Sequence, residues 1–147
     1  MPVRVSGPPA GVRGARLDVA RLRARAKRML AKVGQRASEL SIALVDDREI
    51  RKLNGDWRGR KRATDVLSFS LLEGEGTLHR GKLLGDIVIS VETAARQASS
   101  RHRGLDDEVA RLVIHGLLHI LGHDHEDAGD ARIMRAEQRR LWRALDR

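Results

Sequence analysis

The chain has 147 residues, of which 41% are hydrophobic, and it carries a formal net charge of +9 and no cysteine. This length suits one domain with a buried core, spanning residues 1–147. Disulfides and thiolate metal sites are excluded, and an aromatic content of 2% excludes an RNA-binding surface built on base stacking.

The positive charge is concentrated in the first 36 residues, which hold ten basic residues and one acidic residue, Asp18. In residues 17–33 the apolar side chains share one helical face. Another face carries Arg21, Arg25, Arg28 and Lys32. A second basic cluster comprises Arg58, Arg60, Lys61 and Arg62. Such stripes are often only solvated faces. The alternative is a polyanionic partner, RNA for instance, contacted mainly through its phosphates.

The hydrophobic pattern predicts nine elements along the chain. In order they are a strand (2–6), a helix (16–33), a strand (40–45), a short helix (46–53), two strands (64–69 and 84–91) and three helices (90–103, 105–121 and 127–145). Residues 54–63 are expected to form a basic loop, and the glycine-rich residues 71–82 a turn region.

This order predicts the α+β class, with a small mixed sheet of about four strands and helices packed on it. The first two strands are joined through a helix and should be parallel. The third and fourth strands have a short connection, which favours antiparallel pairing. No segment is long and apolar enough to span a bilayer. No signal peptide is visible, so a cytoplasmic protein that does not enter a membrane is expected.

Three histidines, His115, His119 and His125, have the spacing of a metal site. The first two are four residues apart and would share one face of a helix. Gly122 can then end the helix and turn the chain, so that His125 returns toward the other two imidazoles. Three imidazoles with a fourth position open to water suit zinc, one ion per chain. The predicted metal site therefore lies on a helix and the turn that follows it.

Two details of the histidine segment bear on its chemistry. The spacing is that of metzincin proteases, but their general-base glutamate is replaced by Gly116, which argues against proteolysis. His123 lies two residues before His125 and would point the same way on an extended segment. It therefore remains an alternative third ligand.

Several segments together resemble the YbeY family of rRNA-maturation endoribonucleases. They are Leu53-Asn54, Trp57-Arg58, the Thr-Asp-Val-Leu-Ser-Phe run at 64–69, residues 84–90, and the histidine segment with Glu126. The resemblance covers residues 38–142 in consistent order.

This resemblance implies a single-domain, zinc-dependent endoribonuclease that processes ribosomal RNA, notably at the 3′ end of the small-subunit RNA, and acts in ribosome quality control. Its expected partners are ribosomal RNA and the small ribosomal subunit or its assembly factors. The resemblance implies that His115, His119 and His125 bind the metal and that Arg58 is the functionally important arginine.

Zinc together with an arginine suits a phosphoryl centre, because a guanidinium offers two donors to its oxygens. The nucleophile is either metal-activated water or the 2′-hydroxyl of the RNA, and the residues leave this open. One rival interpretation is a zinc-containing ribosome-assembly or RNA-binding factor without activity. The open fourth metal position argues against it, because structural zinc sites usually have four protein ligands. A metalloprotease-like hydrolase is the other rival.

Overall fold

The computed structural model describes residues 3–10, 12, 16–58, 64–72, 82–123 and 127–145, with only the backbone described at 57 and 58. The elements are β1 (Val3–Ser6), α1 (Val19–Lys32), β2 (Glu39–Val45), α2 (Asp47–Arg58), β3 (Val66–Ser70), β4 (Leu83–Ser90), α3 (Val91–Ser100), α4 (Leu105–Ile120) and α5 (Ala128–Arg143). This order of strands and helices is the predicted one, and the α+β class is confirmed. None of the described helices combines the length and apolar composition needed to cross a membrane.

The four strands form one mixed sheet with the order β1-β2-β4-β3. β1 and β2 are parallel, as predicted, and β4 continues the parallel arrangement next to β2. β3 pairs with β4 in antiparallel orientation, which was also predicted. Along β2, Leu40, Ile42 and Leu44 are buried and their neighbours are less so, which is the alternation of a strand with one face on a core.

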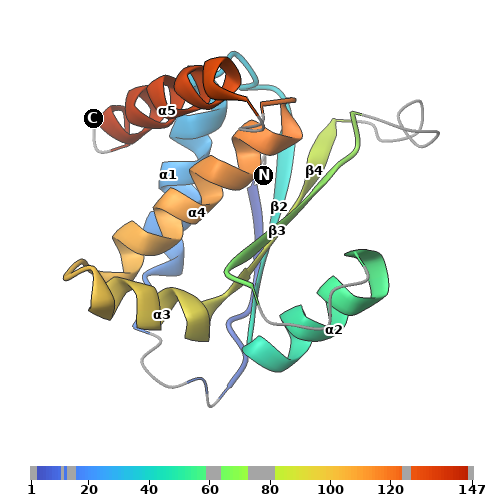
Figure 1. Ribbon diagram of the computed structural model, residues 1–147, viewed down its shortest axis with the longest axis vertical. Coiled ribbons are helices and arrows are strands. Elements are labelled where there is room, and N and C mark those ends of the chain that lie inside the picture. The colour runs from blue at the N-terminus through green and yellow to red at the C-terminus, as the bar shows by residue number, and fades with distance from the viewer. Residues whose placement is uncertain are drawn as a thin grey trace.

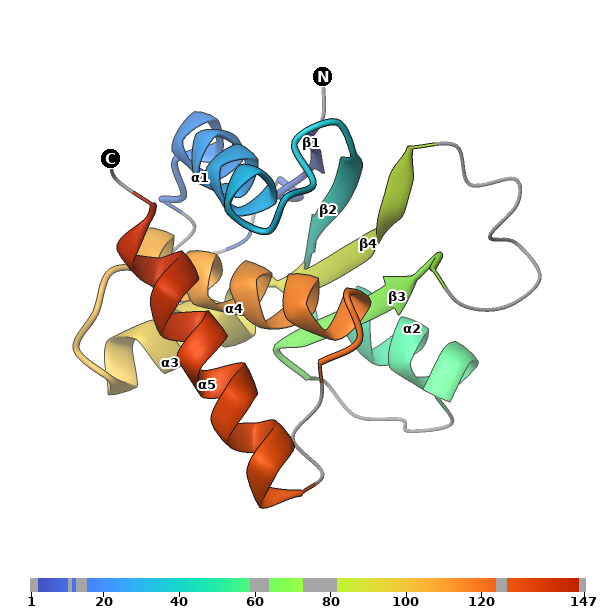
Figure 2. The same ribbon diagram turned by 90° about the horizontal axis from the view of Figure 1, so that it is seen from above.

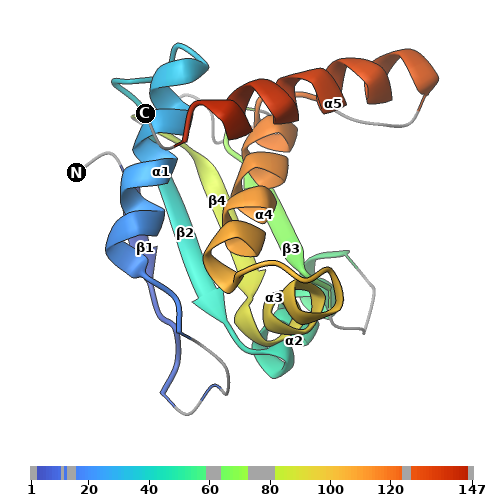
Figure 3. The same ribbon diagram turned by 90° about the vertical axis from the view of Figure 1, so that its left-hand side faces the viewer.

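Helices cover the two faces of the sheet unequally. α1 and α4 lie over one face, and α2 lies alone on the other (Figures 1 and 2). α5 packs on the outer side of α4, and its C-terminal end lies beside α1 (Figure 3). The main hydrophobic core therefore sits between the sheet and the α1–α4 layer. A smaller cluster, Ile50, Leu67 and Val88, lies under α2.

The helix α2 is longer than predicted. The sequence indicates a helix that ends at Leu53, whereas α2 continues to Arg58 through Asn54 and Gly55. Asn54 is only 3% exposed, so tertiary contacts outweigh the low helix propensity of the Asn-Gly pair. Arg58 is therefore the last residue of a helix and does not lie in a loop.

Candidate functional site

The C-terminal half of α4 presents two histidines on one face. The Nε2 atoms of His115 and His119 are 3.1 Å apart, and their ring centroids are 4.5 Å apart. Zinc binds imidazole nitrogen at about 2.0–2.1 Å, so two nitrogens at this separation can share one ion. The donor set of this helix face therefore fits a metal of the zinc type.

Gly116, between the two histidines, lets α4 approach the sheet closely. A Cβ added there would lie 3.1 Å from Cγ2 of Ile87 in β4, which is tighter than ordinary van der Waals contact. The residue that follows the first histidine thus faces the core. Because it packs against Ile87, this position has no room for the general base of a metalloprotease.

The turn that follows α4 has the predicted form. Gly122 has a φ of +98°, which is the left-handed conformation favoured by glycine. The N–H of Gly122 donates to the carbonyl oxygen of His119 at 3.0 Å, and the N–H of His123 donates to that of Leu118 at 2.9 Å. This pair of bonds is the Schellman motif, which ends a helix and redirects the chain.

The other ring nitrogen of His115 contacts α5. His115 Nδ1 lies 3.1 Å from the side-chain amide nitrogen of Gln138. If Nε2 of His115 binds a metal, Nδ1 carries the proton, and an amide can rotate to present its oxygen to that proton. Gln138 is therefore placed to fix the orientation and the tautomer of His115.

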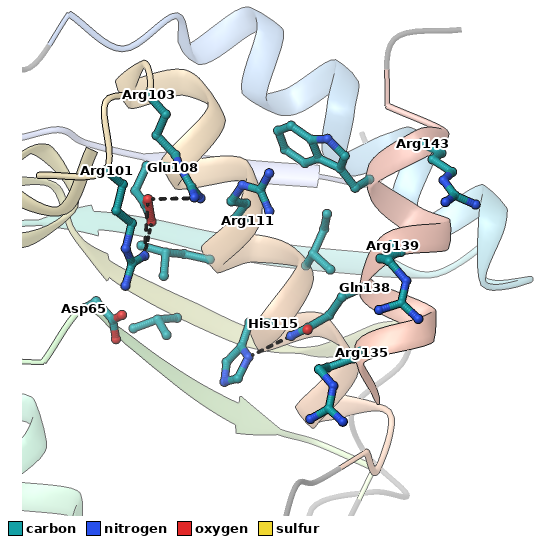
Figure 4. A pocket seen from close by; sticks show the side chains of 14 residues that line it. Asp65, Arg101, Arg103, Glu108, Arg111, His115, Arg135, Gln138, Arg139 and Arg143 are labelled. Atoms are coloured by element: carbon teal, nitrogen blue, oxygen red, sulfur yellow. Dashed lines mark hydrogen bonds and ion pairs between the residues drawn. The ribbon is translucent and has the colours of Figure 1, made fainter. Parts of the chain in front are cut away.

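A hollow of 640 Å³ opens beside His115, between α4 and α5. Figure 4 shows His115 and Gln138 in its wall together with several arginines. Its basic lining residues are Arg101, Arg103, Arg111, Arg135, Arg139 and Arg143. Asp65, at the start of β3, and Glu108 are its acidic lining residues. The hollow next to the histidine pair is thus strongly positive.

Glu108 does not offset the charge of the whole hollow, because two arginines already pair with it. Its side chain is 1% exposed, and it accepts ion pairs from Arg101 at 3.1 Å and from Arg103 at 3.5 Å (Figure 4). Arg135, Arg139 and Arg143 make no ion pair within the described parts of the chain. Arg111, whose guanidinium lies 4.2 Å from the ring centroid of Trp142, likewise has no acidic partner among those residues. These four arginines have charge to offer a ligand.

The sequence model described as Endoribonuclease YbeY matches residues 14–146 of the chain. The chain belongs to the YbeY family. It is 52% identical over 136 residues to an Endoribonuclease YbeY of Anaeromyxobacter dehalogenans, covering 92% of this chain and 67% of that protein. It is 50% identical over 145 residues to the Endoribonuclease YbeY of another Anaeromyxobacter, covering 98% and 72%.

A solved structure with the same fold agrees with this assignment. The solution structure of TM1509 from Thermotoga maritima superposes with a TM-score of 0.66 and 25% sequence identity. The likeness covers 97% of this chain and 88% of that one. The resemblance to the YbeY family inferred from the residues is confirmed.

The third metal ligand predicted for this family member, His125, lies outside the described residues, as do 124 and 126. Within the part that is described, which includes His123, no group of three metal-binding side chains is found. The choice of the third ligand between His125 and His123 therefore stays a prediction. In α5, a hydrogen bond from Arg140 lowers the pKa of Glu137 despite its partial burial, and electrostatic interactions with Arg140 and His123 lower this pKa further.

Arg25 corrects one part of the predicted RNA-binding stripe. Its side chain is 1% exposed, so it cannot meet an RNA phosphate. It bonds Oδ1 of Asp107 at 3.0 Å, and its guanidinium lies 5.8 Å from the ring centroid of Trp142. The acidic first turn of α4 draws this arginine into the interface between α1 and α4.

The other three basic residues of the α1 stripe are exposed. Arg21 forms an ion pair with Asp106 at 3.6 Å, and Arg28 donates to the carbonyl oxygen of Leu145 at 2.6 Å. Lys32 lies at the C-terminal end of α1. Their contact with RNA stays a prediction.

The second predicted basic cluster is largely outside the described residues. Arg60, Lys61 and Arg62 are not described, and at Arg58 only the backbone is. The structure therefore does not test whether Arg58 reaches the histidines.

Sequence reasoning missed the contribution of α5. Arg135, Arg139 and Arg143 line the hollow beside His115, and Gln138 contacts His115 itself. The sequence contained a signal for this basic face, because the three arginines are spaced by four residues and share one face of the predicted helix.

Proposed function

We propose that the chain is a zinc-dependent endoribonuclease that processes ribosomal RNA, with one zinc ion per chain held by His115, His119 and His125. One observation carries the proposal: the Nε2 atoms of His115 and His119 lie 3.1 Å apart, and His115 also lines a hollow rich in arginines. The printed names of relatives that are 50% and 52% identical support the ribonuclease class. The donor set, nitrogen with no thiolate, supports zinc with an exchangeable position.

The residues of the chain would divide the work of phosphodiester cleavage. Zinc, when bound, would supply Lewis-acid polarisation of a phosphoryl oxygen. Gln138 would hold His115 in the tautomer that leaves Nε2 free for the metal. Arg135 and Arg139 would bind phosphates next to the cleaved bond and offset their charge. Gly116 leaves no side chain to act as a base after His115, which favours phosphoryl over peptide chemistry.

Arg58 is the proposed catalytic arginine. The proposal rests on the family pattern and on its position at the end of α2, just before residues that connect to β3. A guanidinium can donate two hydrogen bonds to the phosphoryl oxygens as negative charge develops on them.

The proposed substrate is ribosomal RNA, with the 3′ end of the small-subunit RNA as the site of action. The proposed partners are the small ribosomal subunit or its assembly factors, and the proposed role extends to ribosome quality control. These functions would place the protein in the cytoplasm.

Substitution of Arg58 tests the catalytic assignment. Arg58→Ala should reduce cleavage of a small-subunit RNA fragment by a factor on the order of a hundred, as loss of one charge-stabilising donor typically does. Arg58→Lys should restore only part of the rate, because an ammonium cannot make the two-pronged contact. Arg51→Ala, at an exposed position of the same helix, is the matched control.

The same assay separates the possible outcomes. Zinc content and the thermal unfolding midpoint should match the parent in all three variants. If Arg58→Ala cleaves like the parent, the arginine assignment is wrong and the metal enzyme stands. If the parent cleaves no RNA while it still binds zinc, the non-catalytic assembly factor is the better description. A 2′-deoxy nucleotide at the cleaved position stops attack by the 2′-hydroxyl but permits attack by water.

A further inference from the structure

A second hollow, of 730 Å³, is lined by residues of α1 and α5 and of the segments that follow them. The C-terminal end of α5 lies beside α1, on the side away from the sheet (Figure 3). Among the described residues, the lining of this hollow contains three alanines and no acidic residue. The other lining residues are all basic: Arg28, Lys32, Arg36, Arg139, Arg140 and Arg143. This set is called the α1–α5 groove below.

Two of these cations hold the walls of the groove together. Arg28 of α1 donates to the carbonyl oxygen of Leu145, just beyond α5. Arg140 of α5 donates to the carbonyl oxygen of Lys32 at 3.2 Å and pairs with Glu137 at 2.7 Å. These contacts fix α1 and α5 relative to each other, so the groove is a built feature of the fold.

The remaining four cations are not neutralised. The side chains of Lys32, Arg36, Arg139 and Arg143 make no ion pair or hydrogen bond with the described parts of the chain, and all four are exposed. Arg139 and Arg143 are four residues apart, and like charges at that spacing destabilise a helix. A row of charges that the fold itself does not compensate points to an anionic ligand.

The α1–α5 groove is continuous with the hollow beside His115. Arg139 and Arg143 line both hollows, and Arg135 extends the same helical face toward His115 and Gln138. A positive surface therefore runs from the histidine pair across α5 to the C-terminal end of α1.

We propose that the α1–α5 groove holds the sugar-phosphate backbone of the RNA segment that flanks the cleaved bond. This inference rests on the proposed endoribonuclease function. The described lining of the groove offers cations and alanines but no large apolar or aromatic side chain, whereas protein partners are usually anchored by such residues. Contacts limited to phosphates fit RNA, and they would add affinity without sequence preference.

The first test compares long and short RNA. Lys32→Gln with Arg36→Gln removes the two unpaired cations that line only the groove. Arg48→Gln with Lys52→Gln is the matched control, an Arg and a Lys exposed on α2, on the other face of the sheet (Figure 1). Binding is measured with fluorescent single-stranded RNAs of about 16 and about 4 nucleotides, the two ends of a common range of site sizes.

The groove variant should lose the advantage of long over short RNA. Each phosphate contact on a single strand contributes about 0.7 to the slope of log affinity against log salt. Because the groove variant loses two such contacts, its slope for the long RNA should become shallower by about 1.4. The control should keep the slope of the parent. An unchanged slope in the groove variant would overturn the proposal, as would equal losses in groove variant and control.

The second test locates the RNA directly. Because the chain has no cysteine, Arg36→Cys provides a single site for an iron–chelate that cleaves nearby nucleotides by hydroxyl radicals. The cuts should cluster on one side of the scissile bond, and the same probe at Arg48→Cys should give none. Cuts scattered along the RNA would contradict the proposal that the RNA backbone follows the α1–α5 groove in one defined position.

The outcomes also separate this inference from the proposed function. If the parent cleaves RNA and the groove variant behaves like the control, the track is wrong and the enzyme stands. If groove-dependent binding is found but no cleavage, the proposed activity is wrong and the RNA track stands. If polyglutamate displaces the long RNA at equal concentration of charge, the groove is an acidic-peptide site and the proposal is overturned.

Discussion

The two halves of α4 use charged and polar residues in opposite ways. In the N-terminal half, Asp106, Asp107 and Glu108 each pair with an arginine from another part of the chain. In the C-terminal half, His115 lines a hollow whose α5 arginines have no acidic partner among the described residues, and His119 lies beside it. One half fixes the packing of helices, and the other places two imidazoles next to a basic hollow.

This difference shows that the number of arginines on a surface says little about nucleic-acid binding. Arg25 is buried against Asp107, whereas Arg139, also on a helix, is exposed and has no acidic partner in the described part of the chain. What distinguishes them is whether a carboxylate faces them across the helix interface. The electrostatic surface of this protein follows from the acids as much as from the bases.

Outside the metal ligands themselves, the largest effect on zinc affinity is expected at Gln138, which contacts His115 of the C-terminal half of α4. Gln138→Ala should lower zinc affinity by about 10–100-fold, as loss of a partner that orients a metal ligand typically does. Gln138→Glu should keep most of the affinity, because a carboxylate also accepts the Nδ1 proton of His115. Competition with a chromophoric chelator measures the affinity. An unchanged affinity in Gln138→Ala would mean that α5 does not position His115.

In the structural half, Arg25→Ala should lower the free energy of unfolding by about 2–3 kcal/mol, because it removes a buried charge-assisted hydrogen bond and packing against Trp142. Arg25→Met keeps the apolar stem and should lose less. Urea denaturation measures both. If Arg25→Ala left stability unchanged but made RNA binding less sensitive to salt, Arg25 would be an RNA contact. The claim that the N-terminal half of α4 serves helix packing would then be wrong.

Asp47 extends the structural rule to the other side of the molecule. Burial raises the pKa of its carboxyl, but hydrogen bonds from Ser90, Thr93 and Arg96 and the charge of Arg96 outweigh it, so the pKa is lowered. A lowered folded pKa stabilises the protein above the unfolded value of 3.8, and the gain is lost as pH falls through the folded value. Asp47→Asn should therefore cost about 1–2 kcal/mol at neutral pH. It should also flatten the dependence of stability on pH below about pH 4, near the ordinary pKa of an aspartate carboxyl. Thermal unfolding midpoints of parent and variant, measured from neutral to acidic pH, test this. If the hydrogen bonds to Asp47 contribute nothing, both proteins should lose stability equally as the pH falls.

The smallest effect is expected when two arginines of other helices are compared, one near each half of α4. Arg135→Gln, which removes an unpaired cation beside His115, should make the salt slope of RNA binding shallower by about 0.7. Arg21→Gln should change the slope less, because Asp106 pairs with Arg21 at 3.6 Å. Fluorescence anisotropy over a salt series measures both slopes. Equal changes would mean that pairing with an acid does not withhold an arginine from RNA.

Much of the fold was predictable because its elements are signalled locally. The alternation in β2, the glycine turn after α4 and the apolar face of α1 each fix an element within a few residues. The end of α2 was not predictable, because the burial of Asn54 depends on the tertiary fold. The histidine pair was likewise readable from its spacing, whereas the place of His125 stays a prediction.

The roles of individual arginines could not be read in the same way. Whether Arg25 meets solvent or Asp107 depends on how α1 packs against α4, which the helical period of α1 alone does not specify. The contact between Gln138 and His115 joins residues 23 positions apart on two helices. Such pairings are decided by interhelical geometry.

The central claim, that the end of α4 holds the metal that makes this protein a ribonuclease, is tested most directly by cleavage of a defined small-subunit RNA alongside metal analysis. The parent should contain one zinc per chain, lose cleavage on chelation and regain it when zinc is added back. His119→Ala and His125→Ala should lack both zinc and cleavage, whereas His123→Ala should retain both. If His119→Ala cleaves like the parent, or if His123→Ala loses zinc while His125→Ala keeps it, the account of the site is contradicted.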